Sequence, residues 1–169
     1  MSSEMITVYL GLGSNLGDRE ANLKKAIELL SHRLRLGLVS PIYETEPVGV
    51  PEQPRFLNLA CQVFTRLAAQ DLLALCKGFE SMMGRAGNTS SAPRPIDIDI
   101  LFYGGQVIKS DDLIIPHARL TERAFVLSPL AEIAPGLAHP VNGKTVKELL
   151  ESVAGKEGVV KWKKKAKEG

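Results

Sequence analysis

The chain has 169 residues, of which 44% are hydrophobic and 24% are charged, as in average soluble globular proteins. This length suits one domain and excludes a multidomain enzyme. The net charge is +2, but the last nine positions hold five of the 21 basic residues and one of the 19 acidic residues. The remainder is slightly acidic, which argues against a nucleic-acid-binding or membrane-binding surface. We therefore expect one domain over residues 1–160 and a Lys-rich, disordered tail over residues 161–169, for which a nucleic-acid-binding arm stays an alternative.

In chain order, the hydrophobic periodicity predicts strand 6–10, helix 19–33, strands 36–44 and 56–65, a helix that ends at Gly84, strand 96–102, a short strand 106–108, and helices 122–133 and 146–153. The first six elements have the order strand, helix, strand, strand, helix, strand. This is the order of the α+β ferredoxin-like βαββαβ sandwich, in which two helices cover one face of a mainly antiparallel four-stranded sheet. We expect that fold, with the short hairpin strand and the C-terminal helices as additions.

Glycine, proline and capping residues set the expected ends of these elements. Gly11 is expected to close the first strand in a turn, and Asp18 to cap the first helix. The proline-rich segment 47–54 cannot join either neighbouring strand and predicts a long loop. Gly104-Gly105 predicts a turn that makes residues 106–108 a hairpin partner of the preceding strand, and Thr145 begins a capping box.

Localisation signals are missing from the sequence. The N-terminus lacks a basic start followed by a long apolar run, and no stretch approaches the roughly 18 apolar residues of a membrane-spanning helix. Cys61 and Cys76 stand among apolar neighbours without the spacing of metal ligands. We expect both to be reduced thiols in the core of a cytoplasmic protein.

Asp97 and Asp99 are the most informative polar pair. Because side chains alternate along a strand, both carboxylates point to one face, about 6.5 to 7 Å apart, while the neighbouring isoleucines face the other way. We expect this strand to be central in the sheet, where two close carboxylates call for a positive charge between them. Hard cations such as Mg²⁺ are held by one or two carboxylates together with substrate phosphates. The alternative is the polar, water-facing side of an antiparallel sheet.

Basic residues near this pair suit phosphate groups. Arg94 precedes the aspartates by three residues, and Arg85, Arg123 and His117 lie in loops or at an element end. Carboxylates that hold metal and arginines that hold phosphate are the parts of a phosphoryl-transfer site. Surface ion pairs for the arginines, and a structural role for His117, stay as alternatives.

The glycine-rich segment 11–17 lies between a predicted strand and a predicted helix, but it fits no phosphate-binding motif. Its spacing, G-x-G-x-x-x-G, differs from the dinucleotide fingerprint, and the second strand offers no acidic residue about 20 residues further on. No Lys-Ser or Lys-Thr pair follows a glycine at the offset of a Walker A loop. If the protein binds a nucleotide, metal and arginine must hold its phosphates.

Several short motifs follow one another along residues 6–150. They are Gly13-Ser14-Asn15-Leu16-Gly17, Tyr43-Glu44-Thr45-Glu46-Pro47, Phe56-Leu57-Asn58, Glu80 with Gly84-Arg85, Pro93-Arg94-Pro95-Ile96-Asp97-Ile98-Asp99, Pro116-His117 and Glu122-Arg123-Ala124-Phe125. In this set and order the chain resembles the 6-hydroxymethyl-7,8-dihydropterin pyrophosphokinases of folate biosynthesis, and the Pro-Arg-x-x-Asp-x-Asp segment is the most specific part of the likeness. The resemblance implies transfer of pyrophosphate from ATP to the pterin hydroxyl, with release of AMP.

The resemblance also implies site residues. Asp97 and Asp99 would bind two Mg²⁺ ions. The residues that would contact ATP are Arg85, Arg94, His117 and Arg123, and the first three of these form the catalytic set together with the two aspartates. The residues that would bind the pterin are Thr45, Pro47, Val48, Gly49, Phe56, Asn58 and Phe125. Glu80 would support the site from the end of the second helix, with an ordinary helix-surface acid as the alternative.

The chain departs from the family pattern at Ser90-Ser91-Ala92. The family usually has a basic residue, tryptophan and glycine there, in a loop that closes over ATP, so we expect weaker clamping of the nucleotide, or a lid compensated from elsewhere, rather than loss of the reaction. Other functions stay open: a two-metal nucleotidyl transferase or cyclase, or a non-catalytic ligand- or RNA-binding module of the same topology. The sequence leaves the oligomeric state open, and a monomer is compatible with it.

Overall fold

The computed structural model describes residues 4–45, 55–84 and 95–162. Its helices are α1 (Arg19–Arg33), α2 (Ala69–Met82), α3 (Ala124–Ile133) and α4 (Val146–Ser152), with 3₁₀ turns at Leu120–Glu122 and Lys156–Gly158. Its strands are β1 (Ile6–Ser14), β2 (Arg35–Val39), β3 (Tyr43–Thr45), β4 (Phe56–Thr65), β5 (Asp97–Tyr103), β6 (Ile108–Lys109), β7 (Ile114–Ile115) and β8 (Val159–Lys161). The mixed α/β fold with an antiparallel sheet agrees with the prediction.

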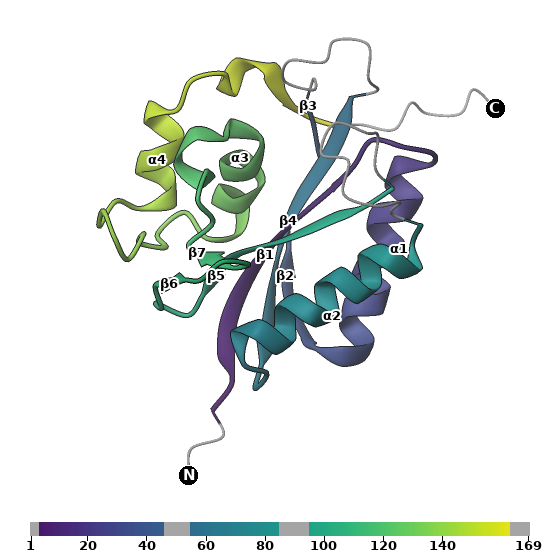
Figure 1. Ribbon diagram of the computed structural model, residues 1–169. Helices are drawn as coiled ribbons and strands as arrows, with labels where there is room; N and C mark the ends of the chain where they lie inside the picture. Colours follow the sequence, from purple (N-terminus) through teal and green to yellow (C-terminus); the bar gives the residue numbers. More distant parts are fainter. Residues whose placement is uncertain (1–3, 46–54, 85–94, 163–169) are drawn as a thin grey trace, which may run out of the picture.

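One sheet runs through the middle of the molecule (Figure 1). Its strand order is β5-β1-β4-β3-β8, with β2 also paired to β4, and every ladder between these strands is antiparallel. α1 and α2 cover one face, and α3 and α4 cover the other. β5 lies at an edge of the sheet, so the expectation that Asp97 and Asp99 stand on a central strand is wrong.

β1 is longer than the sequence predicts, and the expected turn at Gly11 is wrong. The strand continues through Gly11 and Gly13 because β4 and β5 pair with it on both sides as far as Gly13. These two glycines adopt ordinary strand backbone, and their missing side chains make room for residues of neighbouring strands. The chain turns later, at Gly17 with φ +72°, and Asp18 then caps α1 as predicted by accepting a backbone N–H.

Two other strand predictions need correction. The single strand expected over residues 36–44 is two strands, β2 and β3, which are separated around Ser40-Pro41. The Ser40 hydroxyl accepts the backbone N–H of Ala60 at 2.9 Å, so a side chain replaces a ladder carbonyl there. The turn at Gly104 is present, but the strand after it, β6, pairs with β7 and not with β5. The predicted hairpin partner therefore belongs to a separate two-stranded sheet.

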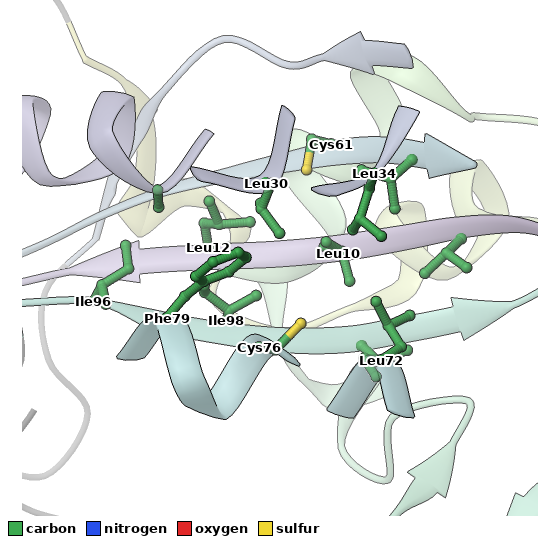
Figure 2. Packing of buried hydrophobic residues seen from close by; sticks show 14 of the residues in the cluster. Leu10, Leu12, Leu30, Leu34, Cys61, Leu72, Cys76, Phe79, Ile96 and Ile98 are labelled. Atoms are coloured by element: carbon green, nitrogen blue, oxygen red, sulfur yellow. The ribbon is translucent and has the colours of Figure 1, made fainter. Parts of the chain in front are cut away.

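Each face of the main sheet has its own apolar core. On the first face, alternate residues of β1, β4 and β5 point toward α1 and α2; Figure 2 shows Leu10, Ile98 and Phe79 in this cluster. Cys61 and Cys76 belong to the same cluster and are free. Both are buried and free of a disulfide, as predicted, and burial raises the pKa of both thiols to about 12, which keeps them in the unreactive protonated form. The second cluster joins β3, β4 and β5 to α3 and α4.

The C-terminal part is more ordered than predicted. α3 begins two residues later than expected, after a 3₁₀ turn, and α4 begins with the predicted capping box at Thr145. β8 then pairs with β3, and the backbone N–H of Trp162 donates to the carbonyl of Ile42 at 2.9 Å. Placing the start of the tail at Lys161 is therefore wrong, and residues 163–169 lie outside the described ranges. None of the helices in these ranges has the length and hydrophobicity of a membrane span.

Candidate active site

Two glycines of β1 form the floor of the candidate site, which we call the glycine trough (Gly11 and Gly13). Gly13 pairs with Asp97 of β5 on one side and with Asn58 of β4 on the other. Residues directly opposite one another in adjacent strands share a face of the sheet, so a carboxylate and an amide flank the trough. A Cβ built on Gly13 would lie 2.8 Å from Asn58 Oδ1. The trough therefore exists because residue 13 has no side chain.

Glu80 holds the strand that carries the two aspartates. Asp97 is half-buried and Asp99 is exposed, and both stand on the face that α3 and α4 cover. Between them, the backbone N–H of Ile98 donates to Glu80 Oε2 at 2.8 Å. Glu80 is only 5% exposed, so its alternative role as a helix-surface acid is wrong. Its carboxylate satisfies an N–H at the open edge of the sheet and fixes the β5 backbone between the aspartates.

Arg123 is the residue immediately before α3, and its side chain approaches the two aspartates. Burial and the neighbouring Arg119 lower the pKa of Arg123, whereas Asp99 and Asp97 act in the opposite direction. The guanidinium is therefore within electrostatic reach of both carboxylates. Its Cζ atom also lies 5.5 Å from the centre of the Phe125 ring, a cation–π contact that orients the two side chains together.

His117 lies beside the same group of charges. Its backbone N–H donates to the carbonyl of Leu101 at 3.1 Å, which ties this segment to β5. Its Nδ1 accepts the backbone N–H of Arg119 at 3.3 Å. Burial, together with the charges of Arg123 and Arg119, lowers the pKa of His117. The imidazole is consequently neutral at pH 7 and can donate a hydrogen bond from Nε2.

The other side of the trough carries three of the four described residues predicted to bind the pterin, Thr45, Phe56 and Asn58. In the β3–β4 ladder, Thr45 pairs with Phe56 and Tyr43 pairs with Asn58. Asn58 is 7% exposed, yet its Nδ2 and the Oγ1 of Thr45 have no hydrogen-bond partner among the residues that the structure describes. Buried polar groups are rarely left in that state, because the cost is about 1–3 kcal/mol each. Two polar atoms are thus positioned to bond a ligand.

Arg19 closes the end of this ladder, and no sequence pattern pointed to it. Its Nη1 donates to Glu44 Oε2 at 2.9 Å and to the carbonyl of Arg55 at 2.7 Å. Glu44 and Arg55 are the neighbours of the Thr45–Phe56 pair, so one guanidinium clamps both strands beside it. The partners of Arg19 stand 25 and 36 residues away, which no local motif could reveal.

Several predicted site residues lie outside the described ranges: Arg85, Arg94, Pro47, Val48 and Gly49, together with the departure at Ser90-Ser91-Ala92. Their roles stay predictions. Among the residues placed by the structure, no group of three or more His, Cys, Asp and Glu side chains could hold a metal ion. Asp97 and Asp99 therefore form a two-carboxylate candidate, which suits Mg²⁺ completed by water and phosphate better than a protein-enclosed zinc site.

Comparison with known proteins identifies close relatives of the chain. A family model described as 7,8-dihydro-6-hydroxymethylpterin-pyrophosphokinase matches residues 9–135. A Bacillus subtilis protein named 2-amino-4-hydroxy-6-hydroxymethyldihydropteridine pyrophosphokinase is 41% identical over 160 residues, which are 94% of this chain and 91% of that protein. The Aquifex aeolicus protein of the same name is 44% identical over 144 residues, or 85% and 90% of the two chains.

Longer proteins contain a similar segment. A folic acid synthesis protein of Dictyostelium discoideum is 46% identical over 133 residues, which are 79% of this chain but 20% of that protein. The crystal structure of wild-type Plasmodium falciparum HPPK-DHPS with pteroate matches 88% of this chain and 44% of that chain, with a TM-score of 0.71 and 18% identity, so the fold is shared. Given the family model and the two bacterial relatives, this chain belongs to the 7,8-dihydro-6-hydroxymethylpterin-pyrophosphokinase family.

Proposed function

We propose that the protein transfers the pyrophosphoryl group of ATP to the hydroxymethyl group of 6-hydroxymethyl-7,8-dihydropterin and releases AMP. One arrangement carries the proposal: two carboxylates suited to metal stand on one side of the glycine trough, and two buried donors, Asn58 Nδ2 and Thr45 Oγ1, stand on the other. The amide carbonyl and ring nitrogens of a pterin are acceptors that suit such donors. The names of the two bacterial relatives support the same reaction.

In the proposed complex the pterin ring occupies the glycine trough. Asn58 and Thr45 bond its polar edge, and the ring stacks against the aromatic faces of Phe125 and Phe56. Arg123 keeps Phe125 in place through their cation–π contact. Pro47, Val48 and Gly49 would complete this pocket from outside the described ranges. The hydroxymethyl group then points across the trough toward Asp97 and Asp99.

The proposed reaction is an in-line displacement at the β-phosphorus of ATP. The pterin hydroxyl oxygen forms a bond to this phosphorus, the bond to the oxygen that bridges the α- and β-phosphates breaks, the hydroxyl proton passes to water, and AMP leaves. Asp97 and Asp99 would hold Mg²⁺, two ions in the full proposal, which would neutralise charge on the triphosphate and make the hydroxyl more acidic. Arg123 bonds phosphate oxygens as a cation and His117 as a neutral donor, with Arg85 and Arg94 as further phosphate ligands.

The finer fold assignment is also a proposal. If β2 and β3 are counted as one strand, the four strands predicted from the sequence lie in the order fourth, first, third, second. This order supports the ferredoxin-like sandwich, to which α3, α4 and β8 are added. The cytoplasmic location and the absence of a nucleic-acid partner stay predictions, and the oligomeric state stays open, with a monomer compatible.

A product assay tests the proposed reaction. Purified protein mixed with ATP, Mg²⁺ and 6-hydroxymethyl-7,8-dihydropterin should form AMP and the pterin diphosphate in equal amounts. ADP as the nucleotide product, or free pyrophosphate with an adenylylated pterin, would overturn the proposal. Binding of both substrates without turnover would favour a non-catalytic module. The control is Asp97→Asn, which should bind the pterin but release no AMP.

A further inference from the structure

Glu132 joins three elements that lie next to the proposed pterin site. It stands near the C-terminal end of α3, and its Oε1 accepts a hydrogen bond of 2.5 Å from the hydroxyl of Tyr43 on β3. The same oxygen lies 3.2 Å from Nζ of Lys161 on β8. We call these three residues the Glu132 network. None of them has a role in the proposed chemistry, and the sequence pattern placed Lys161 in a disordered tail.

The titration of these groups favours the network at neutral pH. Burial, with the hydrogen bond to Glu132, raises the pKa of Tyr43 to about 12, so the phenol keeps its proton. The hydrogen bond from Tyr43 lowers the pKa of the exposed Glu132, and so does the contact with Lys161, whereas desolvation acts in the opposite direction. A protonated phenol therefore donates to an ionised carboxylate. Such charge-assisted hydrogen bonds are about twice as strong as neutral ones.

The network connects directly to both walls of the proposed pterin pocket. On one wall, Tyr43 pairs with Asn58 in the β3–β4 ladder and stands two residues before Thr45. On the other wall, Glu132 and Phe125 are seven residues apart on α3, which places them on the same side of the helix about 10 Å apart along its axis. The contact between Tyr43 and Glu132 thus ties α3, which carries Phe125, to the strand that carries Thr45.

Strand β8 stabilises this contact from the outer edge of the sheet. It pairs with β3 from Tyr43 to Thr45, and Lys161 lies opposite Tyr43 in this ladder. The next residue, Trp162, packs against the apolar cluster on the far face and is the single tryptophan of the chain. β8 therefore holds the strand of Tyr43 through backbone hydrogen bonds and holds Glu132 through a charge. The family model ends at residue 135, well before β8.

We propose that the Glu132 network is a positioning device for the pterin pocket, and that β8 is a functional part of the site. It fixes α3 against β3, so that Phe125 stacks on the pterin while Asn58 and Thr45 bond its edge. This inference rests on the proposed function. Loss of the network should weaken binding of the pterin, while the ATP side, which lies across the trough at Asp97, Asp99 and His117, should be unaffected.

The Tyr43→Phe variant tests the inference, because it removes only the hydroxyl. We expect its Kd and KM for 6-hydroxymethyl-7,8-dihydropterin to rise about 3- to 10-fold, the loss expected for one hydrogen bond, with the KM for ATP unchanged. Lys161→Met should give a smaller rise in the same direction, and Lys161→Arg should restore wild-type binding. Emission of Trp162 before ligand is added reports whether β8 stays docked in each variant.

Tyr103→Phe is the matched control. The hydroxyl of Tyr103 also donates a 2.5 Å hydrogen bond, to the carbonyl of Leu67, but on the face of the sheet away from the site. It should lose comparable stability with unchanged pterin binding. Equal pterin affinity in Tyr43→Phe and wild type, or an equal rise in both KM values, would overturn the inference alone. Failure of the wild type to bind the pterin would overturn the proposed function, and this inference with it.

Discussion

Replacing Gly13 with alanine would place a methyl group in the floor of the glycine trough. The added Cβ would lie 2.8 Å from Asn58 Oδ1 and 3.5 Å from Cδ1 of Phe56. The first distance is shorter than real contacts allow, so Asn58 must rotate away. Its side chain is buried, and overpacking of a buried site costs about 1–3 kcal/mol. Alanine recovers about 0.5–1 kcal/mol because it loses less backbone entropy than glycine on folding.

The net loss of unfolding free energy is therefore at most about 2.5 kcal/mol, which lowers the Tm of a chain of this size by up to about 10 °C. The larger effect falls on the ligand, because the methyl group occupies the trough and Asn58 no longer points into it. We expect pterin affinity to fall at least about tenfold, measured by titration calorimetry, with an unchanged KM for ATP.

Gly11→Ala is the control for this substitution. Its Cβ would meet Leu101 side-chain atoms at 3.4 Å, an ordinary contact with an aliphatic group. Gly11→Ala should therefore keep its stability, and because its methyl group meets Leu101 and leaves Asn58 in place, it should lose less pterin affinity than Gly13→Ala. Equal pterin binding by the two alanine variants would refute the reasoning that residue 13 must lack a side chain to make room for the ring and for Asn58.

Substitutions at three further residues test the site and its supports. Glu80→Leu should lower the free energy of unfolding by about 1–3 kcal/mol in urea titrations, because the N–H of Ile98 loses its acceptor. Glu80→Gln, which keeps an acceptor oxygen, should lose less than half as much. Equal losses in the two variants would contradict the role of Glu80 as that acceptor. Arg19→Met should lower the free energy of unfolding by about 1 kcal/mol and raise the KM for the pterin. If the stability difference between the variant and the wild type stays the same in 1 M NaCl, the ion pair with Glu44 is not its cause. Asp97→Asn should abolish release of AMP; turnover near the wild-type rate would exclude the metal-ligand role.

Local patterns predicted the elements whose ends are set by local contacts. α1 begins and ends where its periodicity and Asp18 indicate, because its cap and its helical bonds lie within a few residues. The sequence pattern ends the first strand too early, at Gly11, because a glycine commonly marks a turn. Position 13 requires a glycine because Asn58 approaches it closely. Asn58 stands 45 positions away in the chain and becomes a neighbour only when β4 pairs with β1.

The same distinction between local and long-range contacts applies to the residues of the candidate site. The spacing of Asp97 and Asp99 sufficed to predict two carboxylates on one face, because strand alternation is a local property. The position of β5 in the sheet is not local, and that prediction was wrong. The sequence pattern puts Lys161 in a charged tail, but in the structure its strand pairs with β3 and its side chain contacts the carboxylate of Glu132. Charge runs alone do not show which of their members have partners.

The edge position of β5 explains why Glu80 is needed. In a central strand, neighbouring strands on both sides would bond the backbone N–H and C=O groups between the aspartates, whereas β5 has only β1, on one side. The N–H of Ile98 would otherwise face the open edge, where strands fray or pair with other chains. Glu80 supplies an acceptor from α2 across that edge. The two aspartates can thus stand at the rim of the sheet, open to a triphosphate, while the backbone N–H between them keeps an acceptor as it would in an interior strand.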